Sequence, residues 1–65
     1  MLVDDVEEKL EEHGEVIIRM DSDKEYELHL GNTEIEDDRI YIDAITREYY
    51  LDASKIESYY VHYEI

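Results

Sequence analysis

From residue 15 onward, the chain alternates apolar and polar residues in short runs that are separated by turn residues. In the first run Val16, Ile18 and Met20 take every second position, with Ile17 and Arg19 between them. Successive side chains of a β-strand point to opposite faces, so a period of two predicts a strand with one buried face. The pattern therefore predicts a sheet region over residues 15–65.

Later runs repeat this alternation, and the residues between the runs favour tight turns. Tyr26, Leu28 and Leu30 alternate with Glu25, Glu27 and His29, which predicts a half-buried strand paired with the first one as a hairpin. A short strand is predicted at Thr33 and Ile35, and another alternating strand is predicted over residues 40–45. Asp, Ser, Gly and Asn are typical turn residues, and we place turns at residues 21–24, 31–32, 36–38 and 46–47.

The N-terminal residues 1–13 have the helical period instead. Val3, Val6 and Leu10 recur at spacings of three and four, which gives one narrow apolar stripe along a helix. Gly14 is placed to end this helix, because glycine adopts the left-handed conformation that follows many helices. A helix this short is unstable alone in water, so its stripe must pack on the sheet.

The C-terminal quarter, from Tyr49 to Ile65, holds five of the seven tyrosines. It is predicted to form a strand at residues 48–51, a short helical turn, and a last strand at residues 56–63. Alternation along that last strand predicts which side chains face the core and which face outward. The inward set is Tyr59, Val61, Tyr63 and Ile65, and the outward set is Tyr60 and His62.

The expected fold is therefore α+β in a single domain, residues 1–65. A short helix precedes about five short antiparallel strands in a meander or small barrel, with a helical turn before the last strand. A chain of this length buries only about 60% of its unfolded surface, so its core is marginal. With no cysteine to form a disulfide, self-association is the remaining means of stabilisation, and we expect a homodimer.

The chain carries a net charge of −14 on 65 residues, yet 43% of its residues are hydrophobic. Disordered acidic tails lack that apolar content, so the charge indicates a folded domain with an acidic surface and solvent cations around it. The composition resembles that of small acidic cytoplasmic proteins of halophilic archaea. The N-terminus carries acidic residues where a signal peptide needs a basic region followed by an apolar one, so we expect a cytoplasmic location. No run is apolar for long enough to span a membrane.

The order of elements also resembles that of small Sm-like β-barrels. In that family a short helical turn precedes the strand that closes the barrel, and residues 52–56 followed by residues 57–63 match this order. The glycine-containing nucleotide-binding motifs of the family are absent. The resemblance therefore implies a barrel-like topology and carries over no RNA-binding residue.

Catalysis and cofactor binding find little support in the sequence. Asp21 and Asp23 resemble the start of a calcium-binding loop, but Tyr26 and Asn32 occupy the positions where glycine and glutamate are needed. His29 and His62 are placed to meet across a sheet, yet no matched third metal ligand is apparent. We expect no enzyme activity, no metal or other cofactor, and no room for a ligand pocket of about 300 Å³ or more.

Protein–protein interaction is the function that the sequence favours. Tyrosine combines an apolar ring with a polar tip, and exposed aromatic patches on small domains mark contact sites. The predicted interaction surface consists of Tyr41, Tyr50, Tyr60 and His62, and its partner is another protein or a second copy of the chain. An Sm-like nucleic-acid-associated module, or an acidic nucleic-acid mimic that binds a basic protein, is the alternative. Direct nucleic-acid binding is disfavoured because three isolated arginines form no basic stripe.

The acidic surface predicts that folding depends on salt. Raising KCl from about 0.1 M to about 1 M shortens the Debye length from about 10 Å to roughly 3 Å, which removes most of the repulsion between carboxylates. We expect folded content by circular dichroism, and association by light scattering, to increase along this series. A chain that is fully folded and monomeric at about 50 mM KCl, where the repulsion is still long-ranged, would contradict both the halophilic interpretation and the homodimer.

Overall fold

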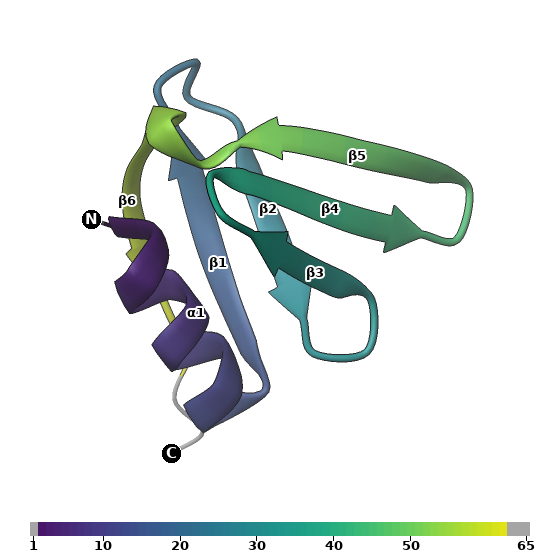
Figure 1. The fold of residues 1–65 in the computed structure, drawn as a ribbon, viewed down its shortest axis with the longest axis horizontal. Helices are drawn as coiled ribbons and strands as arrows, with labels where there is room; N and C mark the ends of the chain where they lie inside the picture. The colour runs from purple at the N-terminus through teal and green to yellow at the C-terminus, as the bar shows by residue number, and fades with distance from the viewer. Residues whose placement is uncertain (1, 63–65) are drawn as a thin grey trace.

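One helix precedes six antiparallel strands in the computed structural model, which describes residues 2–62 (Figure 1). The α+β class and the helical turn before the last strand are confirmed, with one strand more than the expected five. The elements are α1 (Leu2–His13), β1 (Glu15–Met20), β2 (Glu25–His29), β3 (Thr33–Glu36), β4 (Arg39–Ala44), β5 (Arg47–Asp52), the 3-10 turn η1 (Ala53–Lys55) and β6 (Ile56–Tyr60).

The strands form two three-stranded sheets. The first sheet has the order β2-β1-β6, so that β6, the last strand, returns to pair with β1, the first. The second sheet has the order β3-β4-β5. Asp52 begins the turn η1, and its carboxylate accepts hydrogen bonds from the Ser54 backbone N–H at 2.9 Å and the Ser54 hydroxyl at 2.7 Å. These bonds stabilise the carboxylate and lower the pKa of Asp52.

The predicted helix stripe is the buried face of α1. Val3, Val6 and Leu10 are all buried, and the helix packs mainly on β1 and β6. Gly14 ends the helix as predicted, with a φ of +81°. Its N–H donates to the carbonyl of Leu10 at 2.8 Å, which satisfies one of the free carbonyls at the helix end.

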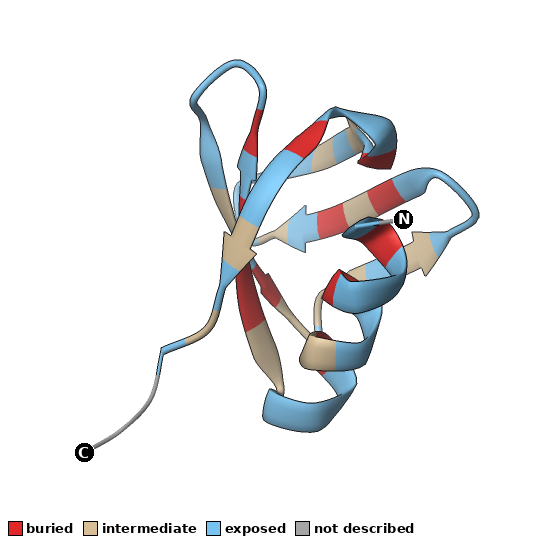
Figure 2. Cartoon of the chain, turned by 90° about the vertical axis from the view of Figure 1, so that its left-hand side faces the viewer, coloured by how far each residue is buried: buried red, intermediate tan, exposed pale blue. Residues whose placement is uncertain are grey.

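The core lies between the helix and the inner faces of the two sheets, where the buried residues gather (Figure 2). Val16 and Ile18 of β1 and Leu28 of β2 are completely buried there, as the alternation predicts. The sheets also meet through an edge-to-face contact between Tyr26 and Tyr49, whose ring centroids are 5.3 Å apart. Across residues 2–62 no charged or polar residue is buried, so the charge lies at the surface.

Three expectations about individual residues need correction. Leu30, expected inward, is 54% exposed because β2 ends at His29 and Leu30 lies in the following turn. Ile17, expected outward, is buried to 5% exposure. The last strand ends at Tyr60 rather than at residue 63, and the inward prediction for Tyr63 and Ile65 falls outside the described residues.

None of the helices within residues 2–62 has the length and apolar character needed to cross a membrane.

The contrast between a core and a surface isoleucine gives a direct test of this packing. Ile40 is 1% exposed, whereas Ile45, in the turn after β4, is fully exposed. Ile40→Val should lower the free energy of unfolding by about 0.5–1.5 kcal/mol, because it leaves a small cavity. Ile45→Val should change it by less than about 0.5 kcal/mol. Urea unfolding of both variants measures the difference, and equal effects would contradict this core.

Candidate functional site

The four residues of the predicted interaction surface form two separate pairs. Tyr41 and Tyr50 are adjacent on the outer face of the second sheet, where the register of β4 and β5 places them opposite each other. Tyr60 and His62 are neighbours on the outer face of the first sheet, with ring centroids 5.7 Å apart. The sequence suggested one tyrosine surface, but the division into two sheets separates it into two.

The Tyr41–Tyr50 pair combines a half-buried ring, Tyr41, with an exposed one, Tyr50. The ring centroids are 5.1 Å apart at an interplanar angle of 45°. Tyr50 is 74% exposed, and its hydroxyl donates to the Glu48 carboxylate at 3.0 Å. The hydrogen bond to Glu48 holds the Tyr50 hydroxyl, while the exposed ring can contact a further group from solvent.

An acidic groove runs beside this pair. It is an open depression of about 590 Å³ on the outer face of the second sheet. A chain this short was not expected to have room for a ligand pocket of about 300 Å³ or more. An open sheet face provides it without an enclosed cavity. The groove is lined by Glu34, Glu36, Asp38, Arg39, Ile40, Tyr41, Tyr50, Leu51 and Asp52, so acidic residues outnumber the single arginine.

Desolvation and the neighbouring carboxylates of Glu48 and Asp43 favour the neutral form of both phenols. The hydrogen bond to Glu48, and the negative charge of that residue, raise the pKa of Tyr50 above its usual 10.0. Partial desolvation, followed by the charges of Glu48 and Asp43, raises the pKa of Tyr41. Both tyrosines are therefore neutral at physiological pH and stand in a negative potential that attracts cations.

Tyr60 has a structural role that sequence analysis did not predict. It is paired with Ile17 of β1, and its hydroxyl donates at 2.7 Å to Glu25 on β2, beyond β1. The tyrosine ring must therefore cross β1, which accounts for the burial of Ile17 on the outer face. The hydrogen bond to Glu25 raises the pKa of Tyr60. Tyr60 is 46% exposed, so it offers less surface to a partner than Tyr50.

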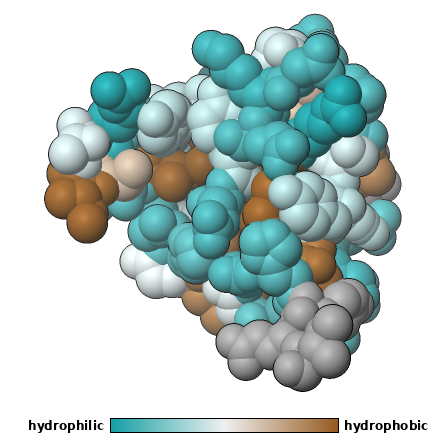
Figure 3. Space-filling model, turned by 180° about the vertical axis from the view of Figure 1, so that it is seen from behind, coloured by the Kyte–Doolittle hydropathy of each residue, from teal (hydrophilic) through white to brown (hydrophobic). Residues whose placement is uncertain are grey.

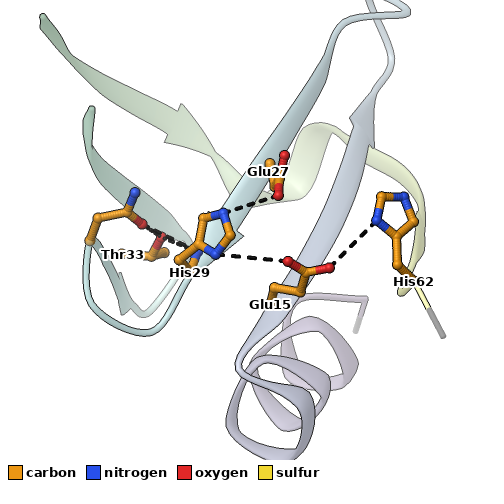
Figure 4. Close-up of polar contacts among 6 residues, drawn as sticks. Glu15, Glu27, His29, Thr33 and His62 are labelled. Atoms are coloured by element: carbon orange, nitrogen blue, oxygen red, sulfur yellow. Dashed lines mark hydrogen bonds and ion pairs between the residues drawn. The ribbon is translucent and has the colours of Figure 1, made fainter. Parts of the chain in front are cut away.

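His62 belongs to a cluster of imidazoles and carboxylates on the same sheet face (Figure 4). Glu15, the first residue of β1, lies between the two histidines. One of its oxygens is 3.5 Å from Nδ1 of His62, and the other is 3.9 Å from Nδ1 of His29. Nε2 of His29 is in turn 3.1 Å from a Glu27 oxygen.

Glu15 is the residue that sequence analysis missed. The ligand atoms of Glu15, Glu27 and His29 all lie within 4.8 Å of one another, which makes this group able to hold a metal ion. The register places Glu15 directly opposite His29, and Ile17 opposite Tyr60. Pairing of β1 with both β2 and β6 was the missing information, because it brings two distant histidines to one glutamate.

The turn after β2 holds the backbone of His29. Its N–H donates to Asn32 Oδ1 and to Thr33 Oγ1, both at 3.2 Å, and the Thr33 hydroxyl donates to Asn32 Oδ1 at 2.8 Å. β2 is an edge strand, so this N–H would otherwise need water as its partner. These bonds limit the movement of His29 at the end of the strand.

The residues resembling a calcium-binding loop form a turn, as predicted. Residues 21–23 are the turn between β1 and β2, and Asp23 has a φ of 70°. The Asp23 carboxylate accepts a hydrogen bond from Arg19 at 2.7 Å. The Asp23 carboxylate is therefore paired with Arg19 of the same hairpin, and the pairing raises the pKa of Arg19.

The fold and its two outer-face clusters define a small α+β domain that buries most of its aliphatic residues and presents aromatic and acidic groups on both sheets. Comparison of the chain with family models, with curated proteins and with solved structures found no match. The resemblances to halophilic acidic proteins and to Sm-like barrels stay predictions.

The contact between Tyr50 and Glu48 can be tested by titration. In Glu48→Gln the pKa of Tyr50 should fall toward 10.0, because the charge that opposes phenolate formation is removed. A raised pKa in the folded state favours the protonated phenol, so this contribution to stability is complete below pH 10 and is lost as pH rises through the folded-state pKa. NMR titration of the Tyr50 ring measures the shift.

Glu8→Gln, on the exposed face of α1, removes the same charge far from the groove and serves as the control. It should leave the titration of Tyr50 unchanged. Identical Tyr50 titrations in the wild-type chain and in Glu48→Gln would contradict the contact.

Proposed function

We propose that this domain is a protein-interaction module without catalytic activity, and that it binds a basic segment of a partner protein in the groove beside Tyr41 and Tyr50. The observation that carries the proposal is the combination of a tyrosine pair, whose Tyr50 ring is exposed, with a groove lined by Glu34, Glu36, Asp38 and Asp52. Aromatic faces and carboxylates together suit lysine and arginine side chains.

The groove offers a cation two kinds of contact. A guanidinium or ammonium group over a tyrosine face gains roughly 0.5–1 kcal/mol at an exposed site. Carboxylates at the rim add hydrogen bonds to the same group, and arginine can make two of them to one carboxylate. The net charge of −14 also increases the rate at which a basic partner is encountered.

A second copy of the chain fits this groove less well than a basic partner. Two copies that met through the groove would bring acidic rims together, and like charges oppose contact unless salt screens them. The homodimer expected from the sequence stays a prediction, as does the cytoplasmic location. The fully exposed Ile45 adds a single apolar side chain at the end of the β4–β5 hairpin, where apolar surface is visible (Figure 3).

Mimicry of nucleic acid is the second candidate function, because the same acidic face would bind a DNA-binding or RNA-binding protein. Direct binding of nucleic acid is disfavoured by the surroundings of the arginines. Arg19 is paired with Asp23 at 2.7 Å, and Arg39 lies in the acidic groove. A phosphate backbone needs a continuous basic surface, which these residues do not form.

Binding of a defined basic peptide tests the proposal. The probe is a synthetic peptide of arginines spaced by glycine, compared with the same peptide carrying neutral citrulline. We expect the arginine peptide to shift amide NMR resonances of β4 and β5, and the citrulline peptide to shift them much less. Tyr50→Ala should weaken binding by roughly twofold to fivefold, as expected from the loss of one exposed cation–π contact.

Ile45→Ala is the matched control, since it removes an exposed apolar side chain at the hairpin tip, outside the groove. It should leave the affinity for the arginine peptide unchanged. Equal binding of both peptides, or an affinity insensitive to Tyr50→Ala, would reject the groove as the site. Competition by DNA for a natural basic partner then favours the mimic over an ordinary interaction module.

A further inference from the structure

We propose that Glu15, Glu27 and His29 bind one divalent transition-metal ion on the outer face of the first sheet, and that His62, which lies beside Glu15, turns toward the ion to complete the site. This face belongs to a different sheet from the Tyr41–Tyr50 groove. The metal site is therefore independent of the proposed peptide binding, and either proposal can fail without the other.

The distances between the side chains are close to those of a metal site. Zinc binds histidine nitrogen and carboxylate oxygen at about 2.0–2.2 Å, so tetrahedral geometry places neighbouring ligand atoms about 3.3 Å apart. With one ligand atom taken from each residue, the atoms of Glu15, Glu27 and His29 lie within 4.8 Å of one another. His29 faces Glu27 through Nε2 at 3.1 Å and Glu15 through Nδ1 at 3.9 Å, and an imidazole binds one ion through a single nitrogen. Binding therefore requires the His29 ring and the carboxylates to rotate, so that one nitrogen and one oxygen from each glutamate meet at the same ion.

Glu15 occupies the middle of the cluster, with one carboxylate oxygen toward each histidine (Figure 4). Its side chain is 29% exposed, which makes it less exposed than the other three members. The central ligand is thus partly shielded from solvent, while His29 and Glu27 can rotate to present one ring nitrogen and one oxygen to the same ion.

The surroundings of His29 support a site rather than a chance contact. The turn residues Asn32 and Thr33 hold its backbone N–H, and pairing with β1 fixes Glu15 opposite it. These contacts fix the backbone positions of the two ligands, which reduces the rearrangement that binding requires of the backbone. A shallow hollow, bordered by His13, Gly14, Glu15, His29 and His62, gives an ion access from solvent.

The ligand set points to a transition metal. Imidazole suits Zn²⁺, Cu²⁺, Ni²⁺ and Fe²⁺, whereas Mg²⁺ and Ca²⁺ prefer sites made of oxygen atoms. Magnesium bound by the many surface carboxylates would have no preference for the two histidines. Selectivity for Zn²⁺ over Mg²⁺ therefore separates the proposed site from the diffuse cations around an acidic surface.

Calorimetric titration of the full chain with ZnCl₂, in a non-chelating buffer with excess MgCl₂, tests the proposal. We expect one Zn²⁺ per chain in the presence of magnesium. Losing a residue that only hydrogen-bonds to a metal ligand typically weakens metal binding by roughly 10–100-fold. His29→Ala removes a ligand itself, so it should weaken zinc binding by more than this. Glu15→Gln should have a similar effect, and NMR should show zinc-dependent shifts of the His29 and His62 rings.

Glu8→Gln is the matched control for charge and should leave the zinc affinity within about twofold, since a lone surface carboxylate contributes little to a site elsewhere. Circular dichroism of each variant verifies the fold, which these exposed or half-buried side chains are not expected to disturb. Loss of zinc binding in excess MgCl₂, or equal affinities for His29→Ala and Glu8→Gln, would overturn the proposal.

Discussion

β1 connects most of the structure, because its inner face packs against α1 in the core that Ile40 and Ile42 of the second sheet share, and β2 and β6 pair with its two edges. Val16 and Ile18 are completely buried there, and they pack with the helix stripe and with Leu28. In a chain of 65 residues the core is small, and the burial of each such residue is a large part of the total stability. Because β1 is the middle strand of its sheet, its inner side chains are covered from both sides and form the centre of that core.

The composition of the outer faces follows from this arrangement. Because the apolar residues that alternate along the strands point to one interior, the other positions carry carboxylates, tyrosines and histidines. Tyr60 is an informative exception, because it covers Ile17 and so adds a small second layer on the outside of β1. The polar faces are consequently ordered by strand register, and their side chains occupy defined positions relative to one another.

The two proposed sites use these ordered faces in different ways. The groove beside Tyr41 and Tyr50 combines ring faces with a rim of carboxylates, which suits a cationic side chain. The cluster around Glu15 combines carboxylates with imidazoles, which suits a transition metal. A uniform acidic surface would attract cations of any kind. The aromatic and imidazole groups are what make each site selective.

Local pattern was sufficient to predict the helix stripe, the strand alternation, Gly14 at the helix end and the α+β class, because each depends on residues close together in the chain. It failed for Leu30, where a strand ended one residue early, and for Ile17, which a tyrosine from a distant strand covers. The sequence by itself determined which residues are apolar and how they alternate. Only the tertiary structure decided that β6 pairs with β1, that the tyrosines divide between two sheets, and that Glu15 lies between two histidines. These outcomes depend on pairing between segments far apart in sequence, which no local period encodes.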